Sequence, residues 1–119
     1  MRKTISKEKR QQVYLKYNGH CAYCGCELQY KDMQVDHLEC VRNNGDNISL
    51  DNLMPACRKC NFYKSTMTLE RFRDQLTKLT SRLEKEFIYK LAKSYGLIIE
   101  TNKPIQFYFE EYTKYVEGI

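Results

Sequence analysis

The sequence predicts a small α+β domain that is held together by a bound metal ion. Three observations support this fold class. The chain has 119 residues, 42% hydrophobic and 29% charged, so its core is modest and benefits from a staple. Two Cys-x-x-Cys pairs flank a segment with strand-like alternation, and a long stretch with helical periodicity follows them. We expect one domain over residues 1–119, since no repeat or linker tract divides the chain.

The first expected element is a helix over residues 6–17. Its charged residues are interleaved with Val13 and Tyr17, as on a helix with one apolar side. The dipeptide Asn18-Gly19 is a natural stop signal for this helix.

Four cysteines are spaced as ligands of one metal ion. In each Cys-x-x-Cys pair a tight turn can aim two sulfurs at the ion, and four thiolates complete the tetrahedral shell of a structural zinc. The predicted zinc ligands are Cys21, Cys24, Cys57 and Cys60. The alternative is that these cysteines are reduced and buried as small hydrophobic residues. Cys26 competes with Cys24 at a poorer spacing, so we interpret Cys26 and Cys40 as ordinary reduced cysteines.

The segment between the cysteine pairs predicts a β-hairpin followed by a helix. Residues 33–38 alternate apolar and polar as a short strand does, and residues 43–47 are a cluster of turn formers. The returning segment, residues 48–54, ends at Pro55. The second cysteine turn then continues into a helix that contains Asn61.

The C-terminal part predicts one long amphipathic helix over about residues 68–96. It starts after Thr68, a plausible N-cap, and ends at Gly96, with a break near residues 80–81. Apolar residues recur in it at steps of three and four: Leu69, Phe72, Leu76, Leu79, Leu83, Phe87, Leu91 and Tyr95. Residues 104–109 favour a final strand, and a polar tail follows to residue 119.

The charge distribution favours a polyanionic partner. The net charge is +5, and residues 1–66 hold 11 basic and 7 acidic side chains, so the cysteine-containing part is the basic part. A solvated surface is the alternative interpretation. The N-terminus has no apolar signal core and no run long enough to span a membrane, so we expect a soluble protein in the cytoplasm.

Four polar residues between and beside the cysteine pairs carry the functional signal. Asp36-His37 lie on the first expected strand, Asn52 lies near the second, and Asn61 directly follows Cys60. The four cysteines Cys21, Cys24, Cys57 and Cys60 together form what we call the clasp. In this order, and with the clasp around them, the four polar residues resemble the HNH nuclease family. The ββα-metal motif of that family places Asp-His on the first strand, Asn near the second, and His or Asn on the helix.

The resemblance covers about residues 14–76 and includes the four-cysteine zinc clasp of many phage and restriction members. It departs from the name-giving pattern at Asn61, where many members have His. The same His-Asn-Asn variant occurs in the HNH domain of RNA-guided DNA nucleases. The resemblance implies a metal-dependent DNA endonuclease in a bacterial or phage-infected cell, with a 5′-phosphate and a 3′-hydroxyl as products.

Each of the four residues suits a step of phosphodiester hydrolysis. His37 can accept a proton from water, because an imidazole titrates near ~6.5. Asp36 and Asn61 offer the oxygen ligands that a catalytic Mg²⁺ or Mn²⁺ prefers. The Asn52 amide has no acid or base chemistry, and we expect it to hold the hairpin or the imidazole in position.

We expect Lys64, Arg58 and Lys59 to contact DNA phosphates, with simple solvation as the alternative. The leucine stripe of the C-terminal helix also suggests a homodimer. Two rival functions remain: a non-catalytic zinc-bound nucleic-acid-binding module, and a protein-interaction adaptor that uses the long helix. Asp36 argues against the first rival, because a carboxylate repels phosphate unless a cation lies between them.

Overall fold

A computed structural model describes residues 4–39 and 48–117, with side chains through residue 112. The chain forms two compact units, one of Met1–Leu69 with Gln106–Ile119 and the other of Glu70–Ile105. The elements in chain order are α1 (Lys7–Leu15), η1 (Tyr30–Asp32), β1 (Gln34–His37), η2 (Leu50–Asn52), β2 (Leu53–Ala56), α3 (Arg58–Lys64), α4 (Leu69–Thr77), α5 (Leu79–Leu83), α6 (Phe87–Ser94) and α7 (Tyr108–Glu117). The expectation of one domain over residues 1–119 stays a prediction.

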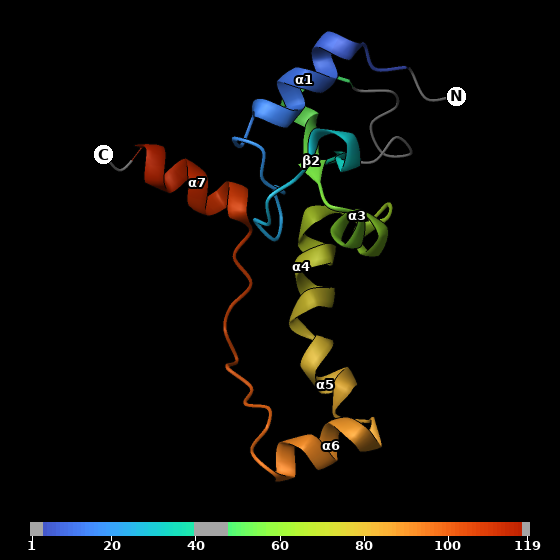
Figure 1. Ribbon diagram of the computed structural model, residues 1–119, viewed down its shortest axis with the longest axis vertical. Coiled ribbons are helices and arrows are strands. Elements are labelled where there is room, and N and C mark those ends of the chain that lie inside the picture. The colour runs from blue at the N-terminus through green and yellow to red at the C-terminus, as the bar shows by residue number, and fades with distance from the viewer. Residues whose placement is uncertain (1–3, 40–47, 118–119) are drawn as a thin grey trace. The chain divides into compact units, whose positions relative to one another are not determined.

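Helix α1 forms where the sequence predicts it and covers the sheet. The Ser6 hydroxyl caps it by accepting a hydrogen bond from the Lys9 backbone N–H at 3.1 Å. Its apolar residue Val13 is fully buried. The helix ends at Leu15 and lies beside β2 (Figure 1).

The predicted hairpin is a two-stranded antiparallel sheet of β1 and β2. Asp36 is opposite Met54, and His37 is opposite Leu53. The expected returning strand is displaced, because residues 50–52 form a 3₁₀ turn and β2 includes Pro55. Proline is tolerated because each strand of a two-stranded sheet has an edge that needs no ladder donor. The expected turn at residues 43–47 and Cys40 lie outside the described residues.

Helix α3 completes the motif. It starts after Cys57, whose sulfur accepts a hydrogen bond from the Cys60 backbone N–H at 3.5 Å, and it packs against β1. Two strands and a helix, together with a cluster of four cysteine sulfurs, confirm the predicted α+β class and its ββα core.

The predicted long C-terminal helix is wrong, because three short helices take its place. Lys78 separates α4 from α5, and Glu86, with extended backbone angles, separates α5 from α6. Within the second unit, the Tyr89 hydroxyl donates to the Glu100 carboxylate at 2.6 Å, which ties α6 to the segment after it. Gly96 ends α6 as predicted: its φ of 72° is left-handed, and the N–H after it bonds to the Ala92 carbonyl at 3.0 Å.

The expected final strand at residues 104–109 is also wrong, because the chain there leads into α7. The backbone N–H groups of Tyr108 and Phe109 bond to the carbonyls of Tyr23 and Ala22, at 3.0 and 2.8 Å. These carbonyls belong to the first cysteine turn, which offers no strand edge to extend. The Glu110 carboxylate caps the Phe107 backbone N–H at 3.0 Å, which favours a helix start. None of the described helices is long and apolar enough to cross a membrane.

Candidate functional site: a cysteine clasp beside a buried carboxylate

The four predicted zinc ligands come together. The sulfurs of Cys21, Cys24, Cys57 and Cys60 all lie within 4.8 Å of one another. The Cys24 and Cys57 sulfurs are 3.8 Å apart, which equals the ~3.8 Å edge of a tetrahedron with ~2.3 Å zinc–sulfur bonds. Over residues 4–39 and 48–117, no other group of three or more His, Cys, Asp or Glu side chains is arranged to share an ion. Four thiols in this arrangement suit structural zinc.

A backbone turn shapes the first half of this cluster. The Gly25 N–H bonds to the Cys21 carbonyl at 3.0 Å, and the Cys21 N–H bonds to the Cys26 carbonyl at 2.8 Å. Gly25 has a φ of 82°, which side chains rarely adopt, and a Cβ at this position would meet the Tyr108 ring at 2.7 Å. Both the backbone angle and the close ring therefore require glycine here. A hydrogen bond between the two thiols lowers the pKa of Cys21 and raises the pKa of Cys60, and the thiolate is the form in which a cysteine sulfur binds zinc. Cys26 is exposed and outside the group of four.

Asp36 is buried, with 4% of its surface exposed, and two donors satisfy it. The Tyr23 hydroxyl donates to Asp36 Oδ2 at 2.5 Å. The Lys64 ammonium lies 3.1 Å from the same oxygen. Burial first, and then the Asp36 charge, raises the pKa of Tyr23 well above its usual range, so the hydroxyl keeps its proton and remains a donor.

Lys64 differs from its expected role at the surface. It is fully buried, and its ammonium also donates to the His37 carbonyl at 3.1 Å and, more weakly, to the Leu38 carbonyl at 3.5 Å. The sequence indicated a contact with DNA phosphate because Lys64 follows Asn61 by one helical turn. The structure instead turns that side chain inward, where a buried carboxylate satisfies its charge.

His37 and Asn52 lie at the same end of the two-stranded sheet, where His37 is opposite Leu53. His37 is the last residue of β1 and is buried. The Asn52 side chain pairs with the Glu39 backbone, accepting from its N–H at 2.8 Å and donating to its carbonyl at 3.3 Å. The Asn52 carbonyl also accepts from the Leu38 N–H at 2.8 Å. Asn52 therefore anchors the chain immediately after the histidine.

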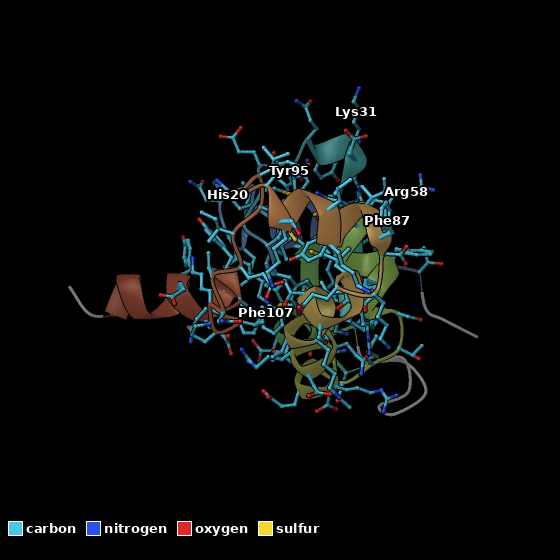
Figure 2. The ribbon with its side chains drawn as sticks, turned by 90° about the horizontal axis from the view of Figure 1, so that it is seen from below. His20, Lys31, Arg58, Phe87, Tyr95 and Phe107 are labelled. Carbon is cyan, nitrogen blue, oxygen red and sulfur yellow. The ribbon has the colours of Figure 1, made fainter. Side chains whose placement is uncertain are left out.

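The remaining predicted residues lie on α3. Asn61 is half-buried and stands one turn before Lys64. Arg58 and Lys59 are exposed in the first turn, and the Arg58 side chain reaches outward in Figure 2. Both surface cations are therefore accessible to a polyanion.

Sequence reasoning missed Tyr23. Tyr23 lies inside a Cys-x-x-Cys turn, where the two intervening residues are usually given no role of their own. Its hydrogen-bond partner, Asp36, lies 13 residues further along the chain. No local pattern in the sequence points to this pairing, because it depends on how the cysteine turn packs against β1.

Comparison with known proteins agrees with this geometry. The HNH endonuclease family matches residues 21–66, inside the range predicted from the sequence. The chain is also 31% identical over 52 residues to a CRISPR-associated endonuclease Cas9 of Corynebacterium diphtheriae. That match covers 44% of this chain and 5% of the Cas9 sequence.

A solved structure is similar as well. The crystal structure of the type II-C Cas9 enzyme from Actinomyces naeslundii matches with a TM-score of 0.53 and 26% identity. The match covers 64% of this chain and 9% of the Cas9 chain, so this chain corresponds to a small part of either relative. Over residues 21–66 the chain is therefore similar to the HNH endonuclease family.

Proposed function

We propose that the protein is a metal-dependent DNA endonuclease that hydrolyses phosphodiester bonds. The observation that carries the proposal is the arrangement around β1: His37 at the strand end, a buried Asp36 beside it, and Asn52 holding the backbone that follows. The match of residues 21–66 to the HNH endonuclease family supports the same chemistry.

His37 is the general base in this proposal. Its imidazole accepts a proton from the attacking water. Asn52 keeps the base in place by fixing the Glu39 backbone two residues later. The products are a 5′-phosphate and a 3′-hydroxyl.

Asp36 and Asn61 are the proposed protein ligands of a catalytic Mg²⁺ or Mn²⁺. When bound, such an ion offsets the charge that develops on phosphate and on the leaving oxygen. A carboxylate and an amide oxygen form a hard donor set suited to it. Both described partners of Asp36 lie on Oδ2, which leaves Oδ1 for a cation.

Zinc on the four cysteines is structural in this proposal. Four thiolates leave no coordination position for water, so the ion stabilises the fold and takes no part in hydrolysis. The exposed Arg58 and Lys59 contact DNA phosphates, as the net charge of +4 over residues 1–66 favours.

We also propose that two copies of the chain associate through the outer side of α6. The inner side is occupied, because Tyr89 and Lys93 both bind the Glu100 carboxylate. The large apolar residues on and just after the helix are instead 72–83% exposed: Phe87, Ile88, Tyr95, Leu97 and Ile99. Phe87 and Tyr95 are labelled at the two ends of this helix in Figure 2.

The area of this surface fits a second copy. At roughly 200 Å² for each fully exposed large side chain, these five residues present about 750 Å². A standard interface buries about 800 Å² on each partner, so the exposed area of these residues is of the size that a second copy would cover.

A plasmid assay tests the nuclease proposal. Supercoiled plasmid is incubated with the zinc-loaded protein and Mg²⁺, Mn²⁺ or EDTA, and nicked or linear products are resolved on a gel. We expect cleavage with either ion and none with EDTA. His37→Ala should lower the rate by about 10²–10⁴ and leave DNA affinity within a few-fold. A wild-type protein that binds DNA and never cuts would favour the non-catalytic binding module.

A further inference from the structure

Tyr23 connects the cysteine clasp to the proposed catalytic carboxylate. It lies between two of the cysteines, Cys21 and Cys24, and its hydroxyl donates to Asp36 Oδ2 at 2.5 Å. Its orientation therefore depends on the same turn that places two sulfurs of the clasp.

The Tyr23 ring is held on its other sides by the C-terminal segment. The Phe107 ring lies 5.4 Å from it at 78°, and the Phe109 ring lies 6.3 Å from it at 86°. Both are edge-to-face contacts, the arrangement that aromatic pairs prefer. Backbone hydrogen bonds of 3.0 and 2.8 Å tie residues 108 and 109 to the cysteine turn itself. The hydroxyl thus has little freedom to move away from Asp36.

The helix that follows the second cysteine turn places a second donor, the Lys64 ammonium, on the same oxygen. Lys64 follows Cys60 by four residues on α3, and its ammonium lies 3.1 Å from Asp36 Oδ2. Each half of the clasp therefore supplies one donor, a neutral hydroxyl from the first and an ammonium from the second. Two donors on one oxygen fix the plane of the carboxylate and so the direction of Oδ1.

We propose that Tyr23 is a positioning residue that sets the orientation of Asp36 toward the divalent cation. The inference rests on the proposed function and deepens it. It means that the first cysteine turn of the clasp, through Tyr23, also orients the carboxylate that binds the cation. Without the hydroxyl, Lys64 is the remaining donor on Asp36 among the described residues, and the carboxylate turns toward that ammonium. Loss of a hydrogen bond that orients a metal ligand costs about 10- to 100-fold in metal affinity.

The experiment compares Tyr23→Phe with Tyr14→Phe. Both changes remove one hydroxyl and keep the ring, and the Tyr14 hydroxyl donates to the Leu28 carbonyl at 2.7 Å, away from Asp36. Free Mn²⁺ is measured by electron paramagnetic resonance in titrations of the zinc-loaded proteins, with bound zinc and Tm recorded in parallel. Asp36→Ala identifies the ion whose binding depends on that carboxylate.

We expect the Mn²⁺ dissociation constant to rise about tenfold in Tyr23→Phe and to stay within twofold in Tyr14→Phe, with full zinc content in both. The Mn²⁺ concentration for half-maximal plasmid cleavage should rise in parallel, while the rate at saturating Mn²⁺ stays close to wild type.

An unchanged Mn²⁺ dissociation constant in Tyr23→Phe would overturn the positioning role, as would a loss of zinc from that variant, which would make the hydroxyl a part of the fold alone. Failure of the nuclease proposal is distinct from either result. A wild-type protein that binds Mn²⁺ through Asp36 and cuts no DNA would refute the nuclease, and the comparison of dissociation constants would still decide the role of Tyr23.

Discussion

The buried ion pair of Lys64 and Asp36 makes a sharp prediction about stability. Lys64→Met keeps most of the side-chain volume and removes the charge. The pair has 0% and 5% of its side-chain surface exposed, so little water reaches Asp36 to compensate its charge when the ammonium is lost. Removing one partner of a buried pair costs about 3–5 kcal/mol. For a chain of this length about 1 kcal/mol corresponds to roughly 4 °C in Tm, so Tm should fall by about 12–20 °C.

The same chain contains a matched control in Lys78→Met. Lys78 and Asp74 form an ion pair at 2.9 Å, as short as the buried pair, and both side chains are more than half exposed. An exposed helical pair at this spacing contributes about 0.3–0.5 kcal/mol, so the control should lose no more than about 2 °C. The identical chemical change then isolates burial as the cause.

Thermal unfolding followed by circular dichroism measures both variants, with zinc content determined on the same samples. Asp36→Asn combined with Lys64→Met should recover part of the loss, because the double variant no longer buries an unpaired charge. Equal Tm values for Lys64→Met and Lys78→Met would refute the reasoning, since the buried geometry would then contribute nothing that the exposed pair does not.

Three further predictions concern the clasp, the proposed cation site and the α6 surface. Cys57→Ser should lower Tm by more than about 10 °C or prevent soluble folding, because zinc-binding energy is folding energy; a stable variant with no zinc by elemental analysis would contradict this. Asn61→Ala should lose most cleavage at limiting Mg²⁺, whereas Asn61→His should keep some and shift toward Ni²⁺, because imidazole is a softer ligand. Equal cleavage by Asn61→Ala and wild type in a metal series would remove Asn61 as a ligand. Phe87→Asp should convert a dimer to a monomer in sedimentation velocity, and a monomeric wild type at 100 µM (~100 times a micromolar Kd) would exclude the interface.

The sequence by itself determined the local features of this protein. The spacing of Cys21 and Cys24 predicts a turn, and repeating it at Cys57 and Cys60 predicts a shared ion, because each turn needs only the residues within it. The end of α6 at Gly96 is local in the same way, since it depends on the left-handed backbone conformation of that one residue. The order of Asp36, His37, Asn52 and Asn61 predicted the family for the same reason, as a pattern within 26 residues.

Only the tertiary structure decided what surrounds Asp36 and where the C-terminal part goes. Lys64 was expected at the surface, and it is buried because the chain brings a carboxylate from 28 residues earlier within 3.1 Å of its ammonium. The leucine stripe was expected to form one helix, and the chain divides it into α4, α5 and α6, with α6 tied to the following segment by Tyr89 and Glu100. Helical periodicity shows which residues are apolar along one side of a helix. It does not show which residue further along the chain will contact that helix. The contacts of Tyr23 with Asp36 and Phe107 depend on three separate segments meeting, and that meeting is a property of the packed chain.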